Sequence, residues 1–225
     1  MNFPDFFDEI PRLRVQDPLA KFLGCSQDGV LEYGFADAVR LTGHSCPTVA
    51  AAYWLTCLAL ERLYPDSLPQ RGGIRVDFRE DARSGSTGVV ATVVQMLTGA
   101  AGGTGFKGID GRYGRVGLIR FAPDLLGSMR FTRLDTRAAV DAIADLSMAP
   151  AHPDVDWLVT RCVGNKATIE EEQRLGALWQ ERVRHLLIDL RRDTAVFTIR
   201  DVDRRPVLAL PPLSHLARHR ALAAR

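Results

Sequence analysis

The longest apolar stretch of the chain, residues 49–60, predicts a buried helix. Its centre, AAAYWLTCLAL, is apolar on nearly every side, as in a helix that other elements cover all round. We expect this helix to occupy residues 48–63, with Pro65 and Pro69 stopping it, because proline disfavours helical continuation.

Strict alternation of apolar and charged residues at 74–79 predicts a half-buried strand, because successive side chains of a strand point to opposite faces. Its sequence is IRVDFR, with Ile74, Val76 and Phe78 on one face. Shorter apolar runs predict further strands at 116–121, 129–134 and 195–199.

Helical patterns account for most of the remaining chain. Residues 1–40 are expected to be a helical preamble, since phenylalanines near the N-terminus fall at helical spacing. Thr168 and Glu171 form a capping box that opens an amphipathic helix to about residue 190. The other predicted helices cover residues 35–41, 89–101, 137–146 and 155–163.

These elements predict an α+β fold, with a small sheet packed against helices and a mostly helical C-terminal portion. The predicted domains are a metal-binding domain at 1–130 and a helical region with one late strand at 131–205. A proline-rich break and a basic tail follow at 206–225.

Composition and charge narrow the classes of function. A formal net charge of +2 over 225 residues gives no general case for nucleic acid as a partner. No stretch approaches the roughly 20 apolar residues that span a bilayer, so no membrane partner is expected. Four cysteines without a C-x-x-C pair, and no N-terminal signal pattern, predict free thiols in a reducing cytoplasm.

The segment Gly43-His44-Ser45-Cys46-Pro47 is the strongest chemical signal in the chain. It places an imidazole and a thiol two residues apart at a helix start, where Pro47 suits the first turn. Imidazole and thiolate are ligands that borderline-soft transition metals prefer. The helix N-terminus would also favour the thiolate form of Cys46.

Three stretches in order resemble the FmdE-like family, whose members are related to a component of formylmethanofuran dehydrogenase. They are GHSCPTVAAAYWLTCLALERLYP, IRVDFRE and VVATVVQMLTGAAGGTGFKGIDGRYGR, which lie within residues 43–115. The resemblance implies an α+β metal-binding domain, often dimeric, with zinc as the usual metal. It carries His44 and Cys46 over as metal ligands.

The chain departs from that family's pattern at three positions. The family places a Cys and an Asp on the second helix and another Cys after its Leu-Thr-Gly, and here those positions hold Val89, Thr92 and Ala100. Either other residues complete the site or the usual chemistry is lost. A His–Cys pair from each of two subunits would give a Cys₂His₂ set that suits structural zinc.

Two other interpretations of Cys46 remain open. The Cys-Pro dipeptide resembles a haem thiolate ligand, which would make this a haem-binding protein or haem enzyme. Alternatively, Cys46 is the catalytic thiolate of an enzyme with His44 as its base.

Eight glycines between positions 99 and 117 predict tight turns or close approach to a ligand. The segment matches neither the dinucleotide-binding nor the P-loop pattern. Lys107, Arg112 and Arg115 within it are candidates to bind a small anionic ligand, such as a carboxylate, a phosphate or a haem propionate. We expect this ligand pocket to lie between the helix start at Pro47 and the glycine-rich segment.

Overall fold

The computed structural model describes residues 2–122 and 124–202, and over these residues the fold is α+β, as predicted. The predicted proline-rich break and basic tail at 206–225 lie outside the described residues. Within the described residues, no helix is long and apolar enough to cross a membrane.

The central element is a five-stranded sheet with the order β4-β3-β5-β6-β7. β3 runs parallel to β4, and the other neighbours are antiparallel. The parallel pair needs a crossover connection, and α4 (Thr87–Thr98) lies within it. The strands are β3 (Ile74–Phe78), β4 (Ile119–Phe121), β5 (Met129–Arg133), β6 (Ala139–Ala144) and β7 (Phe197–Asp201).

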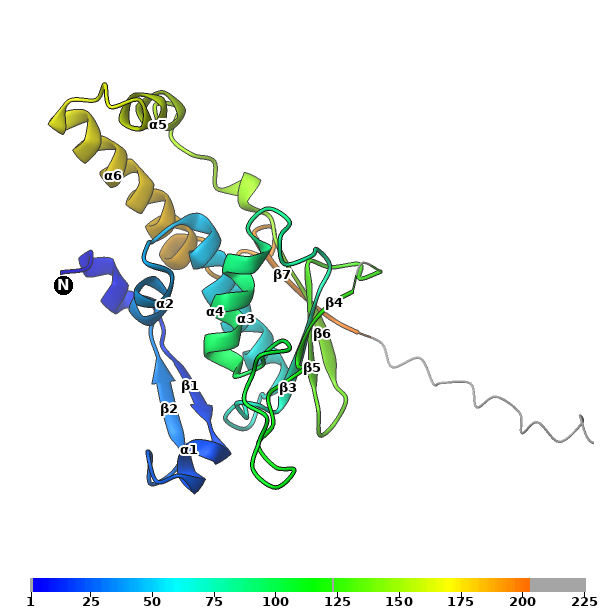
Figure 1. Cartoon of the computed structure of the whole chain (residues 1–225). Helices are drawn as coiled ribbons and strands as arrows, with labels where there is room; N and C mark the ends of the chain where they lie inside the picture. The colour runs from blue at the N-terminus through cyan, green and yellow to red at the C-terminus, as the bar shows by residue number, and fades with distance from the viewer. Residues whose placement is uncertain (1, 123, 203–225) are drawn as a thin grey trace, which may run out of the picture.

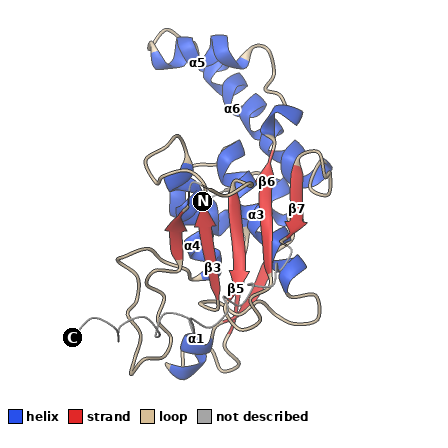
Figure 2. Cartoon of the chain, turned by 90° about the vertical axis from the view of Figure 1, so that its right-hand side faces the viewer, coloured by secondary structure: helices blue, strands red, loops and turns tan. Residues whose placement is uncertain are grey.

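Helix α3 (Pro47–Leu63) packs with α4 on one face of this sheet (Figures 1 and 2). Ile74, Val76 and Phe78 of β3 are buried in the core that these helices form with the sheet. The predicted buried helix, the alternating strand at 74–79 and the helix before the glycine-rich segment are therefore confirmed.

The opposite face of the sheet carries one row of alternating charges across all five strands. The strand register aligns, in order, Arg120, Asp77, Arg130, Asp141 and Arg200. Within the row, Arg130 donates from Nε and Nη2 to the two carboxylate oxygens of Asp141, at 2.7 and 2.8 Å. Opposite charges on neighbouring strands stabilise the pairing register.

The helix predicted at 137–146 is wrong, because this segment is strand β6. Val140 and Ala142 point into the core while Asp141 faces the charged row, a period of two that pairing with β5 and β7 imposes. The turn from β5 places Arg137 at φ +62°, in the left-handed region. The alanine content of this segment favours a helix in isolation, but tertiary pairing overrides that preference.

The helical preamble predicted at 1–40 is also only partly correct. Strands β1 (Leu13–Gln16) and β2 (Val30–Tyr33) form a separate antiparallel pair. The phenylalanine-rich start is a short 3₁₀ helix, η1 (Asp5–Glu9), and α1 (Pro18–Phe22) lies between the strands. The helix predicted at 35–41 is confirmed as α2 (Phe35–Thr42).

Two helices extend beyond the sheet at the top of Figure 1, namely α5 (Val155–Val163) and α6 (Ile169–Arg184). The predicted capping box is confirmed, since Thr168 Oγ1 accepts from the Glu171 N–H and Glu171 Oε2 accepts from the Thr168 N–H. A π-helical turn, η3 (His185–Asp189), continues α6, and a 3₁₀ turn, η2 (Leu146–Met148), precedes α5.

Candidate functional site

The segment with His44 and Cys46 is a tight link between two helices. Gly43 ends α2 in the left-handed conformation, with φ +78°. Cys46 is the N-cap of α3, and Pro47 occupies the first helical position, as the sequence predicts. Both candidate ligands therefore lie within three residues between two fixed helix ends.

His44 is exposed, and one of its two ring nitrogens already has a hydrogen-bond partner. Its Nδ1 lies 3.0 Å from the carbonyl oxygen of Thr42. A carbonyl only accepts hydrogen bonds, so Nδ1 is the donor, and in the neutral ring Nε2 then presents its lone pair. Metal-binding histidines commonly use such a backbone carbonyl to fix the ring and its tautomer.

Cys46 is half-buried against the core, and its Sγ accepts a hydrogen bond from the Val49 N–H at 3.4 Å. The sulfur thus lies at the N-terminal end of α3, beside one of the backbone amides that have no partner within the helix. Thiolate is the form that binds metal or attacks an electrophile.

Helix α6 holds the link in place through Ser45. The Ser45 carbonyl oxygen accepts from Trp179 Nε1 at 3.0 Å and from Gln180 Nε2 at 3.3 Å. The Ser45 hydroxyl donates to Gln180 Oε1 at 2.9 Å. In the sequence, Trp179 is one residue of the amphipathic helix predicted to begin at Thr168, and no local pattern pairs it with a residue 134 positions away.

The chain does not complete a metal site by itself in the part that the structure describes. No group of three or more His, Cys, Asp or Glu side chains there is arranged to hold an ion. Cys57 is buried in α3, and burial raises the pKa of its thiol to about 12. Among the described residues, His44 and Cys46 are therefore joined by no third candidate ligand.

Cys162 lies on α5 and lines an open groove of about 500 Å³ between α5 and α6. Trp179 and Gln180, which hold Ser45, line the same groove. The groove is mostly apolar, and within the described residues Cys162 forms no metal-binding group with His44 and Cys46.

The glycine-rich segment folds back on itself and separates its three cations. Ile109 and Arg112 exchange backbone hydrogen bonds at its tip, while Ala101 and Arg115 pair at its base. Lys107 and Arg112 are exposed, and the Arg112 guanidinium lies 5.0 Å from the Tyr113 ring centroid. Arg115 is buried, so the three side chains do not form one anion-binding cluster.

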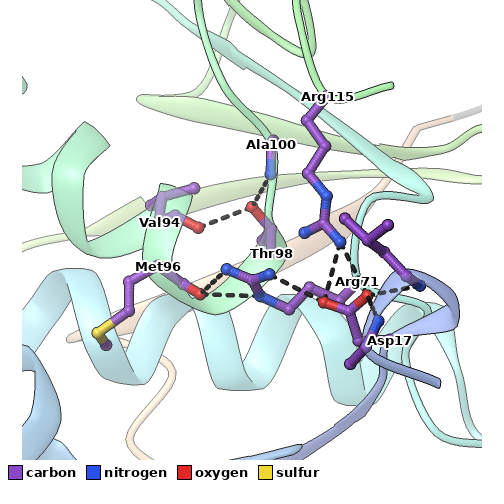
Figure 3. Close-up of polar contacts among 9 residues, drawn as sticks. Asp17, Arg71, Val94, Met96, Thr98, Ala100 and Arg115 are labelled. Carbon is purple, nitrogen blue, oxygen red and sulfur yellow. Dashed lines mark hydrogen bonds and ion pairs between the residues drawn. The ribbon is translucent and has the colours of Figure 1, made fainter. Parts of the chain in front are cut away.

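Arg115 belongs instead to a buried charged cluster with Asp17 and Arg71, which Figure 3 shows. Arg115 Nη2 donates to both Asp17 carboxylate oxygens, at 2.8 and 2.9 Å, and Arg71 Nη1 donates to Oδ2 at 2.9 Å. Asp17 Oδ1 also caps α1 by accepting from the N–H groups of Leu19 and Ala20.

The cluster keeps Asp17 ionised. Burial acts to raise the pKa of this carboxyl, but the hydrogen bonds from Arg115, Arg71 and the Ala20 N–H outweigh it. The net effect holds the pKa below its ordinary value of 3.8. Nothing in the sequence around Asp17 distinguishes it from an ordinary helix cap, so the sequence does not predict this role.

Comparison with known proteins does not identify a family. No protein-family model matches the chain, and no curated protein matches it. The resemblance to FmdE-like proteins therefore stays a prediction that rests on the motifs alone.

Proposed function

We propose that this protein binds a transition-metal ion, with zinc as the expected metal, through His44 Nε2 and Cys46 Sγ. The observation that carries the proposal is the hydrogen bond between His44 Nδ1 and the Thr42 carbonyl, which leaves Nε2 as a lone-pair donor at an exposed position. In the same link, the Val49 N–H donates to Cys46 Sγ.

Two copies of the chain complete the site in this proposal. One copy offers an imidazole and a thiolate, and structural zinc is almost always four-coordinate. The exposure of His44 makes its ring accessible to a second chain. A symmetric dimer that brings two such links together gives a closed Cys₂His₂ set.

The compartment in this proposal follows from the thiols. The four cysteines, Cys25, Cys46, Cys57 and Cys162, are all free. A metal site that depends on a free thiolate is favoured in a reducing compartment, so the proposed location of the dimer is the cytoplasm.

A second candidate function is thiol chemistry at Cys46. Its support is the same N-cap geometry, since a half-buried sulfur that accepts an amide hydrogen bond suits a nucleophile. This alternative needs no metal and no second chain.

Elemental analysis and a visible spectrum of freshly purified protein test the proposal, together with the mass in solution. We expect about one zinc ion per two chains in a dimer. His44→Gln and Cys46→Ser should each lose the metal, whereas Cys25→Ser, a matched control at an exposed cysteine, should retain it.

The other outcomes separate the alternatives. One ion per monomer, or full metal occupancy in both variants, would contradict the shared site. A Soret band in the natural protein that is lost in Cys46→Ser would indicate that Cys46 binds haem and not zinc. A metal-free protein whose Cys46 is alkylated much faster than Cys25 would favour the thiol enzyme.

A further inference from the structure

The buried cluster of Asp17, Arg71 and Arg115 forms the polar end of a pocket. This pocket has a volume of about 530 Å³ and lies between α1, the end of α4 and the glycine-rich segment. Pockets that hold small molecules commonly have volumes of about 300–1,000 Å³. Its lining shares no residue with the segment that contains His44 and Cys46.

The pocket carries uncompensated positive charge. Two guanidinium groups, of Arg71 and Arg115, face one carboxylate, that of Asp17, which leaves a net charge of +1. No other acidic side chain is among the described residues that line the pocket. Because the three charged side chains are themselves largely buried, this charge favours one anionic group beside them.

Some N–H donors of Arg115 have no acceptor among the described residues. Its side chain is only 9% exposed, and Nη2 makes both of its bonds to Asp17. Nε and Nη1 make no hydrogen bond to any described residue. Arg71, in contrast, uses Nε and Nη2 on the Met96 carbonyl and Nη1 on Asp17.

Gly99 lets the Arg115 guanidinium pack directly on the backbone. It lines the pocket, and a β-carbon added there would overlap Arg115 Nη1. The guanidinium therefore occupies the space that a side chain at position 99 would fill. A buried arginine that lines a pocket and keeps N–H donors free is suited to bind a carboxylate.

The remaining walls are mostly apolar. The side chains of Leu19, Leu23, Leu31 and Phe106 line them, and Thr104 lines the pocket from the glycine-rich segment. Such walls suit the hydrocarbon part of a ligand better than a fully hydrated inorganic anion.

We propose that this pocket binds a small organic monocarboxylate. The carboxylate accepts from Arg115 Nη1, and the apolar body of the ligand packs against the leucines and Phe106. The single negative charge of the ligand balances the net charge of the cluster. Of the three cations predicted to bind an anion, only Arg115 lines this pocket, which does not include the start of α3.

The test uses the full-length protein, a panel of monocarboxylates (butyrate, hexanoate and benzoate) and the corresponding neutral amides. Binding is followed by isothermal titration and by the amide NMR signals of Gly99 and Gly105. We expect saturable binding of at least one carboxylate and none of its amide, because the amide lacks the charge that the cluster recognises.

A variant pair at the pocket wall tests the role of charge without disturbing the ion pairs. Thr104 is exposed and lines the pocket. Thr104→Glu adds a negative charge and should weaken carboxylate binding by about tenfold or more, whereas Thr104→Gln should keep it within about twofold. Circular dichroism should show both variants folded.

Three results would overturn the proposal. They are the absence of saturable binding by any member of the panel, equal binding of acid and amide, and equal affinity in Thr104→Glu and Thr104→Gln. Binding of inorganic phosphate in place of the carboxylates would overturn the ligand class. None of these results depends on the metal content of the His44 and Cys46 site.

Discussion

Arg115 Nη2 donates to both carboxylate oxygens of Asp17, and the two residues are 98 positions apart in the chain. This contact joins the glycine-rich segment to the N-cap of α1. Asp17 is only 3% exposed, so its charge depends on the two arginines that surround it. The contact thus fixes both the local fold and the charge of the pocket.

Asp17→Asn should destabilise the protein by about 3–5 kcal/mol, because it leaves two largely buried guanidinium groups without a counter-charge. Asparagine keeps a side-chain oxygen for the cap of α1, so the change isolates the charge. Urea unfolding measures the loss. Asp110→Asn, at an exposed position of the glycine-rich segment, is the control and should stay within about 0.5 kcal/mol. Equal stability of the two variants would contradict the assigned role of the ion pair.

The stability that Asp17 contributes should depend on pH. Its folded-state pKa lies below the ordinary value of 3.8, so the contribution is complete above that pH and is lost as the pH falls through the folded-state pKa. The stability gap between the natural protein and Asp17→Asn should therefore be widest at neutral pH and narrow in acid. Urea titrations at neutral pH and near pH 3 measure this gap. A gap that widens on acidification would show that the pKa is raised instead.

Gly99→Ala should destabilise the protein by about 1–3 kcal/mol, since the backbone there has φ +69° and a side chain would overlap Arg115. Gly102→Ala is a matched control in the same segment, because nothing lies within 4 Å of its added β-carbon. Thermal unfolding of both variants gives the comparison. If Gly102→Ala is the more damaging change, the packing of Arg115 against Gly99 is not the cause.

Trp179→Phe should loosen the link that carries His44 and Cys46. It removes the Nε1 donor to the Ser45 carbonyl and keeps an aromatic ring, so we expect a loss of about 1 kcal/mol. If the proposed metal site is correct, zinc affinity should fall by about tenfold, because the supporting contact orients the ligands. Chelator competition measures this. Trp157→Phe, at an exposed position of α5, is the control and should leave zinc affinity unchanged.

Particular residues show how far sequence patterns reach in this protein. The alternation around Val76, the apolar run of α3 and the capping box at Thr168 are local, and each is found as predicted. A prediction fails where the local composition favours one structure and long-range pairing imposes another. Residues 137–146 have helical composition, but Val140 and Ala142 lie in a strand because neighbouring strands supply its hydrogen bonds.

The candidate metal ligands are evident in the sequence because both belong to one five-residue motif before a helix. The residues that hold them in place are not evident in the sequence. The Thr42 carbonyl and the Val49 N–H contact His44 and Cys46 through the backbone, and Gln180 contacts Ser45 from a distant helix. The same is true of Arg115, which the sequence predicts as a cation of the glycine-rich segment and which is found buried on Asp17.

Local patterns of the chain are enough to predict the α+β class, the core helices α3 and α4, and an imidazole and a thiol at one helix start. These features follow from short-range periodicity and from residues adjacent in the chain. The charged row across the sheet, the support of Ser45 by α6, and the Asp17 cluster with its pocket emerge only in the folded molecule. They arise from strand register and from long-range packing, and neither is encoded in any short stretch of residues.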